Sequence, residues 1–127
     1  MAERERDMLL SNRYFAVEDQ QHAEGGAHFH VRLLGDCDVY RGHFPGNPVS
    51  PGVCNIEMIR ECFAMTVGGD PRIHTIDRCR FTAVASPVKS PELDIDMEWT
   101  VADGAYHLVA TLKDGEQQYL DFKGTLE

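Results

Sequence analysis

The spacing of apolar residues predicts two strands near the start of the chain and four more near its end. Period-two alternation favours strands over residues 13–17 and 28–34, joined across a hairpin signal at Gly25-Gly26. After Pro71 the alternation returns, with Asp-Gly hairpin signals at 103–104 and 114–115. It predicts antiparallel strands over residues 73–85, 93–101, 105–113 and 116–126.

A helical repeat separates the two groups of strands. Apolar residues at helical spacing predict a helix over about residues 51–68. They form strips on two of its faces, so the helix is expected to be largely buried. The start signal is Ser50 as the capping residue followed by Pro51 at the first helical position, and the stop signal is the run from Gly68 to Pro71. The first strip contains Ile56, Ile59, Phe63 and Val67, and the second contains Met58 and Met65.

This order of elements predicts an α+β fold in which an antiparallel sheet wraps around one central helix. Residues 1–127 form a single domain in this interpretation, and residues 1–12 form either a flexible segment or a short polar-faced helix. Residues 35–50 are rich in proline and glycine and are expected to form a long ordered loop. Loops of that length inside a compact domain are often functional.

Composition and charge exclude several classes of function. A net charge of −9 argues against a nucleic-acid partner. No apolar stretch approaches the length of a membrane span or a signal peptide, so we expect a cytoplasmic protein with no membrane partner. The four cysteines form no C-x-x-C pair, and no zinc or other metal site is expected.

The loop and the helix start together offer the parts of an acid-base site. The amides of Gly52 and Val53 lie in the first helical turn, where they can bind a developing oxyanion. An imidazole such as that of His43 suits proton abstraction near neutral pH, and burial of Glu57 is expected to keep it protonated as a general acid. A purely structural interpretation remains open. In it, His43 is only a structural or exposed loop residue, and Glu57 forms a solvated stripe with its charged neighbours.

The stretch from Tyr40 to Phe63, YRGHFPGNPVSPGVCNIEMIRECF, resembles the signature of the FabZ-type β-hydroxyacyl-ACP dehydratases. That signature reads G-H-F-P-x-x-P-x-x-P-G-V and is followed by a helical Glu. The fourteen-residue step from His43 to Glu57 fits it without a gap. Further along, residues 76–81, IDRCRF, resemble the family's I-D-x-x-R/K-F strand.

The resemblance implies a hot-dog fold, a homodimer joined edge to edge, and in some relatives a trimer of dimers. It implies a site shared between subunits, in which His43 of one chain faces Glu57 of the other. His43 would then remove the α-proton of a (3R)-3-hydroxyacyl-ACP, Glu57 would assist departure of water, and the Gly52 amide would hold the thioester carbonyl. The product would be trans-2-enoyl-ACP in fatty-acid or aryl-polyene-type acyl-chain synthesis, and no cofactor would be needed.

The helix departs from the family pattern just after Glu57. Relatives usually continue Glu-Ala-Met-Ala-Gln, whereas here Arg60 and Glu61 add charge near the site. An acidic carrier protein would also need a local basic patch on this acidic chain. The candidates for that patch are Arg72, Arg78, Arg80 and Lys89, which are otherwise ordinary solvated residues.

Rival functions remain on the same fold. A hot-dog acyl thioesterase would use a carboxylate to position water, and would need no histidine in the loop. The five-residue step from Asp38 to His43 resembles that of the MaoC-like hydratases, which implies an enoyl thioester hydratase acting on acyl-CoA. The glycine-proline framework after His43 belongs to the other pattern, however, and this reading leaves Glu57 without a role. A non-catalytic acyl-binding subunit would have no reason to keep both His43 and Glu57.

Overall fold

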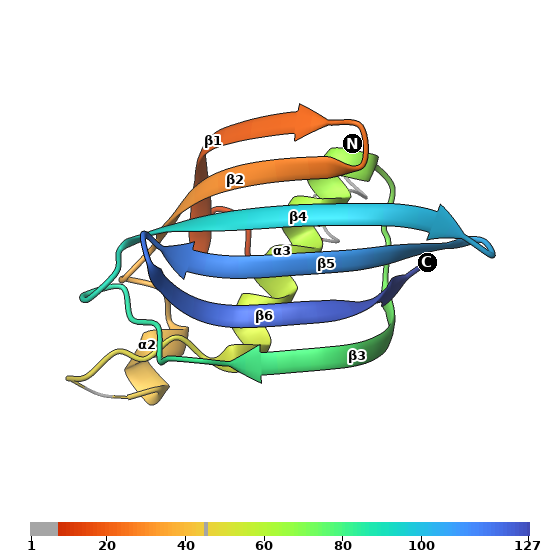
Figure 1. Cartoon of the computed structure of the whole chain (residues 1–127). Helices are drawn as coiled ribbons and strands as arrows, with labels where there is room; N and C mark the ends of the chain where they lie inside the picture. Colours follow the sequence, from red (N-terminus) through yellow and green to blue (C-terminus); the bar gives the residue numbers. More distant parts are fainter. Residues whose placement is uncertain (1–7, 45) are drawn as a thin grey trace.

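The computed structural model describes residues 8–44 and 46–127, so residues 1–7 of the expected N-terminal segment lie outside the described residues. An antiparallel sheet curves around one long helix (Figure 1). The strands are β1 (Phe15–Ala23), β2 (Gly26–Leu33), β3 (Ile73–Phe81), β4 (Glu92–Ala102), β5 (Ala105–Asp114) and β6 (Gln117–Leu126). The helices are α2 (Val39–Gly42) and α3 (Gly52–Val67).

The order of strands across the sheet is β1-β2-β4-β5-β6-β3, and every neighbouring pair is antiparallel. The chain leaves the sheet after β2, forms α3 across one face, and returns at the opposite edge as β3 (Figure 1). β1 and β3 are therefore the two edge strands. The predicted two strands, one helix and four strands are confirmed.

Alternation along the strands decides which face of the sheet packs on α3. On β4 the buried residues Leu93, Ile95 and Met97 alternate with more exposed acidic residues. The ring of Phe63, on α3, packs edge-on against Trp99 and Tyr106, with centroid distances of 5.2 and 5.1 Å. The core thus lies between α3 and the concave face of the sheet, where burial of apolar and aromatic side chains stabilises the fold.

The start of α3 differs from the prediction. Pro51 is extended (φ −63°, ψ 138°) and stands before the first helical residue, and no side chain caps the helix. The Ser50 hydroxyl is bonded instead to the Tyr40 hydroxyl at 3.0 Å, and the Ser50 amide donates to the Ala85 carbonyl at 2.8 Å. Ser50 therefore fastens the loop to other elements and is unavailable as a cap.

Other boundaries differ too, and the first strand, predicted over residues 13–17, runs over Phe15–Ala23. The expected loop contains the short helix α2, whose buried Tyr40 stacks with Tyr14 at a centroid distance of 5.9 Å. β3 ends at Phe81 and does not reach Ala85, because the chain there turns away from β6 and bonds to the loop before α3. No described helix combines the length and the apolar character that crossing a membrane requires.

Candidate active site

His43 lies in the loop between α2 and α3 with its ring half-buried. Its Nδ1 is 3.0 Å from the Val49 carbonyl oxygen. Because a carbonyl oxygen can only accept, Nδ1 carries the proton and Nε2 keeps a free lone pair. The ring also stacks on Phe44, with centroids 4.3 Å apart and planes at 20°. His43 is thus held in the tautomer that a general base acting through Nε2 needs.

The loop that carries His43 is ordered by its own backbone. Phe44 and Asn47 exchange hydrogen bonds between amide and carbonyl at 3.0 and 2.9 Å, and the Val49 amide donates to the His43 carbonyl at 2.9 Å. The Ser50 bond to Ala85 then ties this turn to the segment after β3. His43 therefore stands on a small closed turn directly before the helix.

The Gly52 and Val53 amides open α3, where the helix supplies no carbonyl to them. The Pro51 carbonyl already accepts from the next two amides, those of Cys54 and Asn55, at 3.1 Å each. A Cβ at position 52 would lie 2.6 Å from Cζ of Phe81, so any larger residue there would displace the Phe81 ring. Phe81, at the end of β3, thus packs directly on the helix start.

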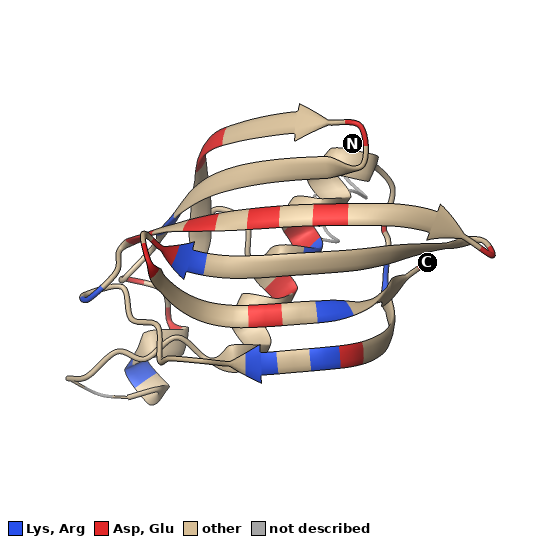
Figure 2. Ribbon diagram, viewed as in Figure 1, with Lys and Arg blue, Asp and Glu red and all other residues tan. Residues whose placement is uncertain are grey.

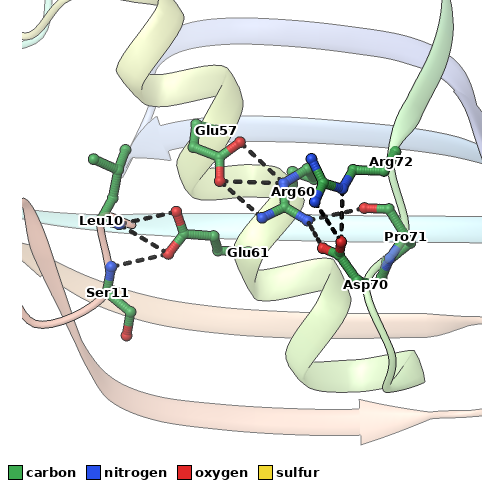
Figure 3. Close-up of polar contacts among 8 residues, drawn as sticks. All are labelled: Leu10, Ser11, Glu57, Arg60, Glu61, Asp70, Pro71 and Arg72. Carbon is green, nitrogen blue, oxygen red and sulfur yellow. Dashed lines mark hydrogen bonds and ion pairs between the residues drawn. The ribbon is translucent and has the colours of Figure 1, made fainter. Parts of the chain in front are cut away.

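Glu57 lies on the second turn of α3, with 28% of its side chain exposed. The Arg60 guanidinium binds both of its oxygens, with Nε 2.9 Å from Oε1 and Nη2 2.9 Å from Oε2 (Figure 3). Burial raises the pKa of Glu57, but the hydrogen bonds and positive charge of Arg60 outweigh it and lower that pKa. The expectation that Glu57 is kept protonated by burial is therefore wrong for this chain, because that expectation left out Arg60.

Arg60 itself is buried, with 7% of its side chain exposed. Its Nη1 donates to the Asp70 carboxylate at 3.2 Å and to the Pro71 carbonyl at 2.9 Å. Asp70 in turn binds Arg72 at 2.6 Å. Arg60 therefore joins the middle of α3 to the segment that leads into β3.

Glu61 is fully buried one helical turn after Glu57. Its carboxyl group accepts from the Leu10 amide at 3.0 Å and from the Ser11 amide at 2.9 Å (Figure 3). Burial and the neighbouring Glu57 carboxylate raise the pKa of Glu61 to about 7. In the sequence, Arg60 and Glu61 stand out only as departures from the family pattern after Glu57. In the structure, both lie beside Glu57.

We call the five side chains Glu57, Arg60, Glu61, Asp70 and Arg72 the carboxylate cluster.

Comparison with known proteins identifies the family of the chain. A family model described as ApeI-like, ApeI dehydratase, matches residues 18–120. The chain belongs to this ApeI-like family. The resemblance to FabZ-type dehydratases inferred from the loop and helix is confirmed, and so is the hot-dog fold.

Curated relatives in the comparison are named 3-hydroxyacyl-(acyl-carrier-protein) dehydratase FabZ. The Bacillus pumilus protein is 31% identical over 118 residues, which cover 85% of this chain and 77% of that protein. The Oenococcus oeni protein is 30% identical over 88 residues, 63% of each chain. The chain spans about three fifths of the length of the first curated relatives that it matches.

A solved structure supports the fold. "The Dehydratase Heterocomplex ApeI:P from Xenorhabdus doucetiae" superimposes with a TM-score of 0.71 at 20% identity, covering 87% of this chain and 96% of that one. The six-stranded sheet and the central helix of this family member therefore have the same arrangement as in that complex.

Within the described part of this family member, no hydrogen bond or ion pair joins His43 to Glu57. His43 bonds to Val49 within its own loop, whereas Glu57 faces Arg60. The helix-start amides lie between the two residues in sequence. One chain thus carries a base, amide donors and a carboxylate, but base and carboxylate have separate partners.

The predicted carrier-docking residues fall into two groups. Arg72 belongs to the carboxylate cluster through Asp70, so it is not a simple solvated charge. Arg78 and Arg80 lie on the edge strand β3, and Arg78 pairs with Asp121 on β6 at 3.1 Å. Lys89 is exposed in the connection to β4. Basic bands mark β3 at one edge of the sheet, whereas acidic bands run along β4 in its middle (Figure 2).

Proposed function

We propose that the chain dehydrates a (3R)-3-hydroxyacyl thioester to the trans-2-enoyl thioester. The observation that carries this proposal is the His43 tautomer, because the Val49 carbonyl fixes the proton on Nδ1 and leaves Nε2 to act as a base. The amide donors at the helix start and the carboxylate of Glu57 complete the set of groups that the elimination needs. Membership of a dehydratase family supports the same reaction.

The chemistry follows from these groups. Nε2 of His43 takes the proton from the α-carbon, and the electrons of the broken C–H bond form the C=C bond. The charge that develops on the thioester oxygen is stabilised by the first-turn amide of Gly52 and by that of Val53. The C–O bond at the β-carbon breaks, and the hydroxyl group leaves as water after receiving a proton delivered through Glu57. The thioester itself acidifies the α-carbon, so the proposal includes no cofactor.

The proposed site is shared between two copies of the chain. In the described part of the chain β3 is an edge strand, so its outer backbone groups can pair with another strand, and its end packs on the helix start through Phe81. A second copy joined there would bring its own loop to this edge, and each His43 would face the partner's Glu57. The absence of a His43 to Glu57 bond within the described part of one chain supports this arrangement. The assembly is a homodimer, alone or as a trimer of dimers; a heterodimer with a related subunit is the other outcome of the test.

We assign the carrier as an acidic acyl carrier protein that docks on Arg78, Arg80 and Lys89. Arg78 and Arg80 are two residues apart on β3, so they share a face of the edge strand, and that strand ends beside the helix start. Local positive charge of this kind steers an acidic partner even when the whole chain is acidic. Acyl-chain synthesis of the fatty-acid or aryl-polyene type is the setting that fits such a carrier.

Reversing the charge at both β3 arginines, Arg78→Glu with Arg80→Glu, is expected to raise KM for the carrier-linked substrate roughly tenfold or more, since like charges repel the carrier. The kcat/KM for an uncharged pantetheine thioester should stay close to the wild-type value. Steady-state kinetics on both substrates measure the difference. Arg32→Glu on β2 serves as the control, because it reverses one exposed arginine near the opposite edge of the sheet. Unchanged kinetics on the carrier-linked substrate would exclude docking at β3.

The function itself is tested with the purified wild-type chain and a (3R)-3-hydroxyacyl carrier protein. Mass spectrometry of the acyl-carrier species should show loss of one water, and the reverse reaction should hydrate the enoyl form. Release of a free carrier thiol without loss of water would identify a thioesterase and overturn the proposal.

A further inference from the structure

The carboxylate cluster contains three carboxyl groups and two guanidinium groups. Arg60 binds Glu57 on one side and Asp70 on the other, and Arg72 binds Asp70 again. Glu61 is the third carboxyl group, and among the described residues the backbone amides of Leu10 and Ser11 donate hydrogen bonds to it.

A buried carboxyl group beside a second carboxylate is stabilised by holding a proton. Glu61 is wholly buried and lies four residues after Glu57, on the same face of α3. Two like charges one helical turn apart repel, and Arg60 favours the ionised form at Glu57. A proton held by this pair therefore resides mainly on Glu61. The raised pKa of Glu61, about 7, and the lowered pKa of Glu57 agree with this distribution.

Among the residues that the structure describes, the groups near Glu61 come from three segments. The residues concerned are Glu57, Arg60 and Cys62 on α3, Asp70 and Arg72 before β3, and the amides of Leu10 and Ser11 before β1. The amide bonds stabilise the ionised form of Glu61 as well, so Glu61 can release its proton and take it back. A group held near neutral pH in this way is suited to proton transfer.

We propose that Glu61 is a positioning residue that supplies Glu57 with the proton delivered to the departing hydroxyl group. In the reaction, His43 gains the α-proton, Glu61 passes its proton to the ionised Glu57, and Glu57 delivers that proton to the leaving oxygen. The C–H and C–O bonds break, the C=C bond forms and one water leaves. Glu61 is left ionised and His43 protonated, and exchange with solvent restores both. This inference rests on the proposed dehydratase function.

Glu61→Gln tests the inference, because an amide keeps an acceptor for the Leu10 and Ser11 amides but holds no transferable proton. The expected result is a fall in kcat of about tenfold or more with KM nearly unchanged. In the wild type, kcat should fall as pH rises through about 7, since the proton donor is then lost. That step should be missing from the pH profile of the Glu61→Gln variant. Glu61→Asp, which keeps a titratable carboxyl group, should restore part of kcat and the step.

A second readout does not depend on activity. Carboxyl signals of glutamate in the full chain, followed by carbon-13 NMR against pH, should include one that titrates near 7 in the wild type and is absent in Glu61→Gln. The exposed Glu98→Gln variant is the matched control and should leave that signal in place. A wild-type chain that shows the titration but no dehydration would overturn the proposed function and leave the raised pKa of Glu61 intact. A pH profile and a titration that are the same in Glu61→Gln as in the wild type would overturn the inference.

Discussion

His43→Ala is expected to lower kcat for dehydration by about 10²–10⁴-fold, which is the usual contribution of a positioned general base. The variant removes the Nε2 lone pair that the bond from Nδ1 to the Val49 carbonyl makes available. It also removes the ring that stacks on Phe44. KM should change less than kcat, because the carrier and most of the acyl chain bind elsewhere. Single-turnover measurements of enoyl formation separate the two quantities.

The control for this variant is His107→Ala, which deletes an exposed imidazole on β5. It should keep wild-type kcat. Thermal unfolding of both variants checks that the loop before α3 has not collapsed. Dehydration by folded His43→Ala at the wild-type rate would remove His43 from the reaction.

Glu57→Gln is expected to lower kcat by a similar factor, about 10²–10⁴-fold, because a carboxamide cannot deliver a proton to the leaving hydroxyl group. Gln retains an oxygen that can accept from Arg60, so the buried guanidinium keeps a partner at this position as well as Asp70 and Pro71. The variant should therefore fold. Kinetics on the carrier-linked substrate, together with chemical denaturation, measure both effects.

The kcat of the Glu57→Gln variant decides whether Glu57 delivers the proton. Glu98→Gln on the exposed face of β4 is the matched substitution and should not change kcat. Wild-type kcat in a folded Glu57→Gln variant would show that the departing oxygen receives its proton from elsewhere in the site. The same substitution should also shift the titration of Glu61 downward, since it removes the neighbouring negative charge that raises the pKa of Glu61.

The sequence predicted the elements of the fold well because each has a clear period. The alternation of Leu93, Ile95 and Met97 with acidic residues marks the buried face of β4 without any tertiary information. The helix start was harder to predict. Ser50 has the chemistry of a capping residue, but its hydroxyl bonds to Tyr40 from α2, an element that the proline-rich and glycine-rich loop concealed.

The candidate site was only partly visible in the sequence. The spacing of His43 and Glu57 is local and could be compared directly with a known signature. The ionisation of Glu57 depends on Arg60, a near neighbour on α3. The ionisation of Glu61 depends on burial, on Glu57 and on backbone amides about fifty residues away. The contact of Gly52 with Phe81 likewise joins two elements that are distant in sequence. Long-range contacts of this kind leave no periodic signal, so only the structure supplies them.

The central claim is that each site combines His43 of one chain with Glu57 of its partner. Coexpression of His43→Ala and Glu57→Gln chains with different tags allows the mixed dimer to be purified and assayed. By two-fold symmetry one of its two sites would have both groups intact, so the account predicts about half of the wild-type activity per dimer. A mixed dimer as inactive as its two parents would contradict the shared site.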